Sequence, residues 1–363
     1  MAGYIMSLDS LKSLELYAKY GVYATKLSEP RNGNWAGHHE GTFADYLTMK
    51  AGDNIYFFKD RKIYGIGELA AVGGECKYKN FPDATIPHRY KYSDIKDLLL
   101  WDENQDDSQR VICLFKEYPK FFKQGIDMDD VLASNPSAFR SLRVFWKLSF
   151  IKLDDDENQA LKDVILRLNK DYLNSTDENE VFRSDYTSFH QDILRKVNSS
   201  YELSARDILY YSSDGDHIRH EMAIEAGILD QLTTGEDNAI RTFGHWDYLS
   251  HQVPASPFKP VDYMDKMDVF GYAYLPGFPR TKYKFLVIEL KKDAASCDNV
   301  DQLMKYVDWV KDEYSFGDYS MIEAFLVAHS FSQEVMDHAR EIAKRTYIFG
   351  RRPARSNTWN NLR

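Results

Sequence analysis

An apolar segment that ends in two charged residues, FLVIELKK (285–292), constrains this chain more than any other feature. Its composition predicts a buried strand, in which successive side chains leave opposite faces. Glu289 and Lys291 are two residues apart and therefore share a face, on which Phe285 and Val287 lie further back. A charged pair at the end of so apolar a strand costs stability unless it is paired or binds a metal ion. The segment therefore predicts a buried strand with a candidate metal site at one end.

The elements expected around this strand define the fold class as α/β. Helical patterns cover 217–232 and 297–314, and strand patterns cover 267–275, 282–292 and 321–331. A further strand is expected before this group of strands, and a further helix after it. The order helix, three strands, helix, strand, helix predicts an α/β sandwich around a mixed sheet flanked by helices.

The length of 363 residues indicates two domains. The first segment has a mixed α/β pattern with many strands, including a hairpin over 55–69. A polar, charged stretch over 175–185 is typical of a linker. We therefore expect one domain over 1–172, a linker over 173–190 and a second domain over 191–363.

Composition narrows the class of protein further. No stretch approaches the roughly 18 consecutive apolar residues of a membrane span, and the first ten residues lack the pattern of a secretory signal. The three cysteines are too scattered for a disulfide framework or a zinc cluster. These features favour a cytoplasmic protein that does not bind membranes.

Charge is distributed unevenly along the chain. The net charge of −10 argues against a protein that coats nucleic acid over its whole surface, but a local basic surface is compatible with it. The last twenty residues contain no acidic residue. This segment is either a solubilising tail or a segment that contacts the phosphate backbone of a nucleic acid. The candidate contact residues are Arg351, Arg352 and Arg355.

Carboxylates elsewhere in the second domain complete a candidate metal site. Asp268 lies in the strand before Glu289, and the loop between them is long enough for the two strands to lie side by side. Mg²⁺ prefers hard oxygen ligands that converge on one point, and a nearby cation such as Lys291 can hold the attacking water. Glu221 and Glu225 lie one helical turn apart, so either can add a carboxylate. The alternative for Glu289 and Lys291 is an ordinary surface ion pair, without a functional role, at a solvated strand end.

The spacing Asp268, then Glu289-Leu290-Lys291, resembles the D…ExK motif of the PD-(D/E)XK nuclease superfamily. The resemblance covers about residues 200–350, and the later Gln302 and Tyr306 match the QxxxY pattern of the RecB-like branch. Met267 stands where the motif usually has proline, which is a departure from the pattern.

The resemblance implies a restriction-endonuclease-like domain that uses Mg²⁺ or Mn²⁺ to hydrolyse phosphodiester bonds. The implied metal ligands are Asp268, Glu289 and Leu290. Lys291 would position the attacking water, and Glu225 or Glu221 would complete the acidic cluster. Gln302 is a further candidate for the catalytic site, although it could simply border the core.

The amino-terminal domain resembles the EVE group of PUA-like domains over about residues 15–170. The residues that carry the resemblance are Trp35 and Gly37, then the strand motif GDNIYFF (52–58), then the motif IYGIG (63–67). The resemblance implies a barrel-like pocket that holds a nucleobase, often a modified base flipped from a duplex.

Residues for such a pocket can be named from the sequence. Aromatic rings stack on bases, although each ring has hydrophobic core as its ordinary role. The candidate walls are Trp35, Tyr46, Phe57 and Trp146, and the candidate phosphate contacts are Arg31 and His38.

Together the two resemblances imply a modification-dependent restriction endonuclease for anti-phage defence, acting on double-stranded DNA with modified bases. A single catalytic site per chain would make a homodimer necessary for double-strand cleavage. A repair or recombination nuclease that recognises DNA structure is one alternative, and a non-catalytic nucleic-acid-binding module is another. The base modification, the choice of DNA over RNA and the cleavage position stay open.

Overall fold

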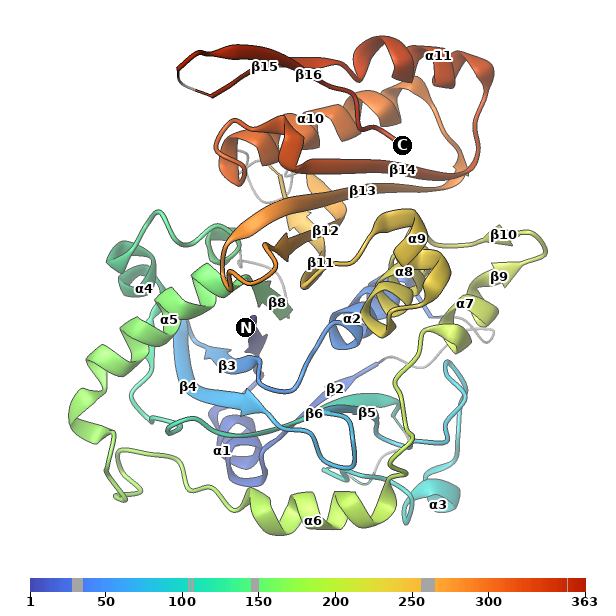
Figure 1. Cartoon of the computed structure of the whole chain (residues 1–363). Coiled ribbons are helices and arrows are strands. Elements are labelled where there is room, and N and C mark those ends of the chain that lie inside the picture. The colour runs from blue at the N-terminus through green and yellow to red at the C-terminus, as the bar shows by residue number, and fades with distance from the viewer. Residues whose placement is uncertain (28–34, 104, 106–107, 145–149, 256–264, 351) are drawn as a thin grey trace. The chain divides into compact units, whose positions relative to one another are not determined.

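The computed structural model describes the chain except for residues 28–34, 104, 106–107, 145–149, 256–264 and 351 (Figure 1). The chain divides into two compact units, Met1–Asp207 and Ile208–Arg363. This division lies after Asp207, well beyond the end of the expected linker at residue 190. Within that expected linker, Val181 forms a β-bridge with Phe122, so the segment packs as part of the first unit.

In the described part of the first unit, eight strands form one sheet that curls into a half-barrel. Their order is β2-β6-β4-β3-β1-β8, with β5 beside β6 and β7 beside β4. The strands are β1 (Gly3–Ser7), β2 (Val22–Lys26), β3 (Asn54–Lys59), β4 (Lys62–Leu69), β5 (Lys77–Lys79), β6 (Arg110–Glu117), β7 (Ile126–Asp127) and β8 (Phe150–Leu153). The hairpin predicted over 55–69 is β3 and β4.

Helices pack on this sheet through apolar side chains at helical spacing. On α5, Leu161, Val164 and Ile165 are buried in the core of the first unit, as their spacing predicts. Helix α6 contacts α1, which places it in the first unit. The helices are α1 (Leu11–Tyr20), α2 (Gly37–Leu47), α3 (Tyr92–Ile95), α4 (Met128–Ser134), α5 (Asp155–Leu168), α6 (Tyr186–Lys196) and, across the division, α7 (Arg206–Ser212).

The second unit contains the predicted mixed sheet with helices. Its order is β11-β12-β13-β14. The first three strands are antiparallel, while β13 and β14 are parallel because α10 connects them as a crossover helix. The elements are β11 (Tyr248–Pro254), β12 (Lys266–Tyr274), β13 (Lys282–Ala294), α10 (Cys297–Glu313) and β14 (Ile322–Ser330).

Helix α10 shows how the sequence specifies this unit. Ser296 and Asn299 form a capping box at its start, and Val300, Leu303 and Val307 are among its buried face. The other helices are α8 (Glu221–Thr234), α9 (Asp237–Phe243) and α11 (Gln333–Ile342), and α8 contacts the sheet through β11, β12 and β13. Figure 1 shows α10 covering β13 and β14.

Two short hairpins complete the second unit. They are β9 (Ser213–Asp214) with β10 (His217–Ile218), and β15 (Arg345–Phe349) with β16 (Arg355–Trp359). The prediction of a helix over 217–232 was therefore wrong at its start, because a turn at Gly215 with a φ of 63° returns the chain as β10.

None of the helices in the described part of the chain combines the length and apolar character that crossing a membrane requires.

Candidate active site

The Asp268 carboxylate lies where β12 and β13 separate. The ladder between these strands ends with the pair Val269 and Ile288, so Asp268 and Leu290 lie beyond it. There the Leu290 N–H donates a hydrogen bond to Asp268 Oδ2 at 2.7 Å. On its other edge, β13 stays paired with β14 as far as Lys291 and beyond. The Asp268 side chain thus takes the place of a main-chain partner at the end of β13.

Glu289 is the most deeply buried carboxylate of the group, with 0% of its surface exposed. Its Oε1 lies 2.7 Å from Lys291 Nζ, because the two side chains share the strand face that their spacing predicts. Its Oε2 accepts no hydrogen bond from an N–H donor among the described residues, and the Asp268 carboxyl group lies within hydrogen-bonding reach of the Glu289 carboxyl group. Two buried carboxyl groups this close are costly when both are ionised, so they favour binding a cation or a proton.

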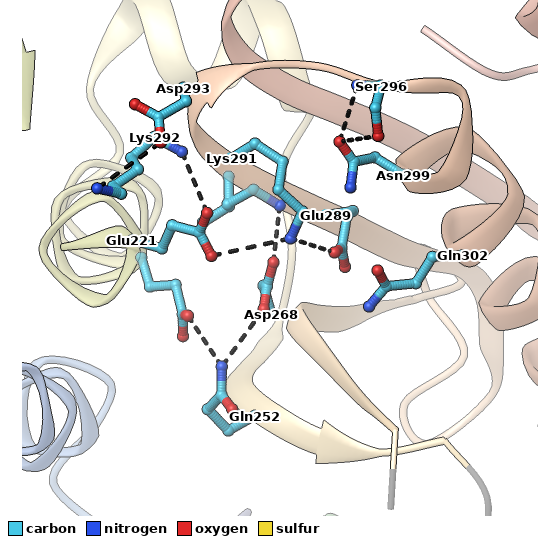
Figure 2. Close-up of polar contacts among 12 residues, drawn as sticks. Glu221, Gln252, Asp268, Glu289, Lys291, Lys292, Asp293, Ser296, Asn299 and Gln302 are labelled. Atoms are coloured by element: carbon cyan, nitrogen blue, oxygen red, sulfur yellow. Dashed lines mark hydrogen bonds and ion pairs between the residues drawn. The ribbon is translucent and has the colours of Figure 1, made fainter.

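Glu225 on α8 is also buried, with 1% of its surface exposed. Its Oε1 accepts a hydrogen bond from Gln252 Nε2 at 2.9 Å, and its Oε2 lies 3.2 Å from His251 Nδ1. Gln252 Nε2 also lies 3.4 Å from Asp268 Oδ1. Figure 2 shows the Gln252 side chain directed at Asp268. Glu225 is therefore connected to Asp268 through one amide group.

Glu221, one turn earlier on α8, reaches the group at a different point. Its Oε2 lies 3.8 Å from Lys291 Nζ, and its Oε1 accepts a hydrogen bond from the Lys292 N–H at 3.3 Å (Figure 2). The sequence left open which of the two helix glutamates joins the site. The structure brings both of them to it, Glu225 through Gln252 and Glu221 through Lys291.

Gln302 and Tyr306 of α10 border the same carboxylates. Gln302 Nε2 donates a hydrogen bond to the Tyr306 hydroxyl at 2.7 Å. Burial raises the pKa of Tyr306 well above its usual range, and the negative charges of Glu289 and Asp268 raise it further. Figure 2 shows Gln302 extending from α10 beside Glu289. The pair predicted from the QxxxY spacing therefore lies at the acidic cluster.

The protonation states of the site reflect crowding of negative charge. Burial, Glu289 and Glu225 together raise the pKa of Asp268 to about 8. Burial also raises the pKa of Glu289, against the opposing effect of Lys291. Burial disfavours the Lys291 ammonium, but its pairing with Glu289 outweighs this and raises the pKa of Lys291. Asp268 and Glu289 therefore hold protons more tightly than ordinary carboxyl groups, and a cation that binds there would displace those protons into solvent.

These residues have the chemistry of a site for a hard divalent cation. Asp268, Glu289 and the main-chain carbonyl of Leu290 are oxygen donors, the type that Mg²⁺ and Mn²⁺ prefer. The close approach of the buried Glu289 carboxyl group to that of Asp268 is the observation that a cation would explain. The oxygen donors of these residues therefore suit the predicted Mg²⁺ or Mn²⁺ ion.

A second acidic cluster lies in the first unit. Asp154, Asp155 and Asp156 each offer a carboxylate oxygen, and these oxygens lie within 4.8 Å of one another. They could bind a metal ion. Asp154 also caps α5, because its carboxylate accepts hydrogen bonds from the N–H groups of Asp156 and Glu157.

The rings predicted to line a base pocket are largely inside the first unit. Tyr46 and Phe57 have no exposed surface, and Trp35 is 3% exposed. Tyr46 packs against Phe150, and Phe57 packs against the rings of Phe115 and Phe121. With this burial, the three rings are core side chains rather than an open surface on which a base could stack. Their role in base binding stays a prediction.

The remaining predicted nucleic-acid contacts are spread over the chain. His38 is exposed at the start of α2, and its ring lies 3.9 Å from that of His39. Arg352 and Arg355 are exposed at the β15–β16 hairpin. In Figure 1 this hairpin lies on one side of α10 and β12 lies on the other. The structure does not bring these arginines to the carboxylates. Three predicted residues lie outside the described residues: Arg31, Trp146 and Arg351.

Several contacts of the site were not predicted, among them that of His251. His251 was not among the predicted site residues, yet its Nδ1 lies 3.2 Å from Glu225 Oε2. The available signal was its position in the strand preceding Asp268, next to Gln252.

Comparisons with known proteins give only distant similarity. No family model and no curated protein matches the chain. A repair endonuclease from Pyrococcus abyssi is similar to it with 22% identity over 36% of this chain, at a TM-score of 0.22. The protein Atu2648 from Agrobacterium tumefaciens is similar with 15% identity over 45% of this chain and 92% of that protein, at a TM-score of 0.24. The alignment spans 46% of the repair endonuclease, less than half its length.

Proposed function

We propose that this chain is a metal-dependent nuclease that hydrolyses phosphodiester bonds in double-stranded DNA. The observation that carries the proposal is the fully buried Glu289 carboxyl group, which pairs with Lys291 at 2.7 Å and lies against the Asp268 carboxyl group, so that two acidic groups share one buried place. An ion pair with a purely structural role would not be expected to have a second acidic group against it. The match of Asp268, Glu289 and Lys291 to the D…ExK motif supports the same conclusion.

Each residue has a distinct role in this proposal. Asp268 and Glu289 hold the cation, and the Leu290 N–H fixes the orientation of Asp268. The Lys291 ammonium, held beside Glu289, orients the attacking water and stabilises negative charge on the phosphate. Bound Mg²⁺ or Mn²⁺ would supply Lewis acidity toward the phosphate and lower the pKa of water. Glu225 and Glu221 add negative charge at the edge of the site.

We further propose that the first unit reads a modified base and that the protein acts in restriction of foreign DNA. Support comes from the resemblance of its motifs to PUA-like domains and from the curled sheet that carries them. A chain with one such site cuts both strands only as a pair of copies, so a homodimer during cleavage is part of the proposal. Arg352 and Arg355, exposed on the β15–β16 hairpin, are proposed to contact the DNA backbone.

A cleavage assay with Mg²⁺ on four matched duplexes tests the proposal. The duplexes share one sequence and carry cytosine, methylcytosine, hydroxymethylcytosine or glucosylated cytosine. Glu289→Ala and Glu289→Gln are the active-site variants. Glu323→Gln is the matched control, because Glu323 pairs with Lys284 at 2.7 Å on the neighbouring strand, outside the site.

Each outcome of this assay has a definite meaning. Cleavage of one modified duplex alone, lost with either Glu289 variant, supports both the nuclease and the reader. Equal cleavage of all four duplexes would retain the nuclease and remove the reader, which favours a repair nuclease. Binding without cleavage on every duplex would favour a non-catalytic binding module.

A further inference from the structure

Gln252 has a backbone conformation that is unusual inside a strand. Its φ is +51°, in the left-handed region that side chains other than glycine rarely adopt. On either side of it, β11 pairs normally with β12, through His251 with Val269 and Val253 with Met267. This register places Gln252 directly across from Asp268.

The unusual conformation changes which side chains face the acidic cluster. In a regular strand, His251 and Gln252 would point to opposite faces of the sheet. Here both side chains contact the same carboxylate, that of Glu225. The left-handed residue breaks the alternation, and a non-glycine residue keeps this conformation only where its surroundings hold it.

The Gln252 amide group is well suited to its two partners. Its nitrogen carries two hydrogens, and it lies 2.9 Å from Glu225 Oε1 and 3.4 Å from Asp268 Oδ1. The amide presents its nitrogen, the donor end, toward the Glu225 oxygen that accepts the hydrogen bond. One neutral group thereby bridges the carboxyl groups of Glu225 and Asp268.

We propose that Gln252 is a positioning residue for the metal site: its amide holds Asp268 and Glu225 in the arrangement that binds the cation. This inference rests on the proposed metal-dependent function. With Oδ2 held by the Leu290 N–H and Oδ1 by Gln252, the Asp268 carboxylate is fixed at both ends. Groups that orient metal ligands in this way typically contribute about 10- to 100-fold to metal affinity or activity.

Two substitutions separate the amide from the backbone. Gln252→Met keeps the length of an unbranched side chain and removes both N–H donors. Gln252→Gly also removes the donors, but it accepts a φ of +51° without strain. The matched control is Gln333→Met, because Gln333 donates to Asp337 at 3.0 Å on the exposed surface of α11.

Mn²⁺ binding to the full chain without DNA, measured by calorimetry, gives a readout independent of activity. We expect both Gln252 variants to bind Mn²⁺ at least about tenfold more weakly, with a thermal midpoint in EDTA close to that of the unaltered chain. Turnover on DNA should fall by about 10- to 100-fold with KM unchanged. Gln333→Met should match the unaltered chain in every measurement.

The possible failures are distinguishable. Unaltered Mn²⁺ affinity in both variants would overturn the role of Gln252 and leave the nuclease proposal standing. Weaker binding in Gln252→Gly alone would assign the effect to the backbone and overturn the role of the amide. An unaltered chain that neither binds Mn²⁺ nor cleaves DNA would overturn the proposed function, and the positioning role with it.

Discussion

The N–H group of Leu290 donates a 2.7 Å hydrogen bond to the Asp268 carboxylate, 22 residues earlier in the chain. This bond ties Asp268 to the strand that carries Glu289. The relative position of the two carboxylates is therefore set by the sheet rather than by a loop. Sites built on strands hold their ligands with more precision than sites built on loops, which makes substitutions here informative.

Glu289→Gln should abolish cleavage, with a loss of at least about 100-fold, because the amide removes the negative charge that binds the cation. Folding should persist, since glutamine has the same size and no buried charge. Cleavage rates and Mn²⁺ calorimetry on the variant measure both effects. Cleavage at the unaltered rate would remove Glu289 from the mechanism. Mn²⁺ binding could also persist in Glu289→Gln and be lost only when Asp155 and Asp156 are replaced as well. That result would place the ion at the start of α5 instead.

Lys291→Met should separate metal binding from catalysis. Cleavage should fall by about 10²- to 10⁴-fold, because the cation that orients water is lost, while Mn²⁺ binding should persist. Without metal, Glu289 loses its 2.7 Å partner, so the thermal midpoint in EDTA should fall and recover on addition of Mn²⁺.

Lys284→Met provides the comparison for Lys291→Met, because Lys284 pairs with Glu323 at the same distance but is 42% exposed. Its loss should cost less than about 1 kcal/mol and leave cleavage unchanged. Equal effects of the two substitutions would show that Lys291 has only an ordinary ion-pair role.

The sequence was most informative where local periodicity decides the geometry. Alternation along one strand was enough to place Glu289 beside Lys291, and helical spacing was enough to predict the buried face of α10. The approach of Asp268 to this pair followed from the order of the strands. These features depend on neighbours in sequence or on a single strand pairing.

Other features depend on tertiary contacts that no local pattern encodes. The division into units lies after α6 because α6 packs on α1, more than 150 residues earlier in the chain. The choice between Glu221 and Glu225 could not be made, since both lie on the same face of one helix. The left-handed conformation of Gln252 has no sequence signal, because glutamine is not a residue that favours it.

Gly65→Ala should be one of the most destabilising substitutions in the first unit. Gly65 has a φ of +69°, and a Cβ atom there would lie 1.8 Å from the ring of buried Phe121. Overpacking and backbone strain together should cost about 3 kcal/mol or more. Gly52→Ala separates the two effects, because its φ is +95° but a Cβ atom would meet nothing within 4 Å. Gly52→Ala should lower the free energy of unfolding by only about 1–2 kcal/mol. Equal losses for the two variants in urea unfolding would contradict a clash between the new Cβ atom at position 65 and Phe121.

The last prediction concerns Lys152, which is only 8% exposed in the first unit. Burial lowers its pKa to about 7, against the opposing charge of Asp53. In the unfolded chain a lysine has a pKa of about 10.4, so between about pH 7 and 10 the unfolded state binds more protons than the folded state. The free energy of unfolding should therefore rise with pH across this window, by at most about 1.4 kcal/mol per pH unit from this group.

Lys152→Met removes the titrating group and should remove this slope. Urea unfolding of the unaltered chain and of the variant between pH 6 and 10 gives the difference, in which the other titrating groups largely cancel. Lys116→Met is the control: Lys116 bonds to Glu68 at 2.9 Å, and this bond raises its pKa, so its difference should not grow over the same window. A flat difference between the unaltered chain and Lys152→Met would mean that Lys152 keeps an ordinary pKa, through hydration or pairing that offsets its burial.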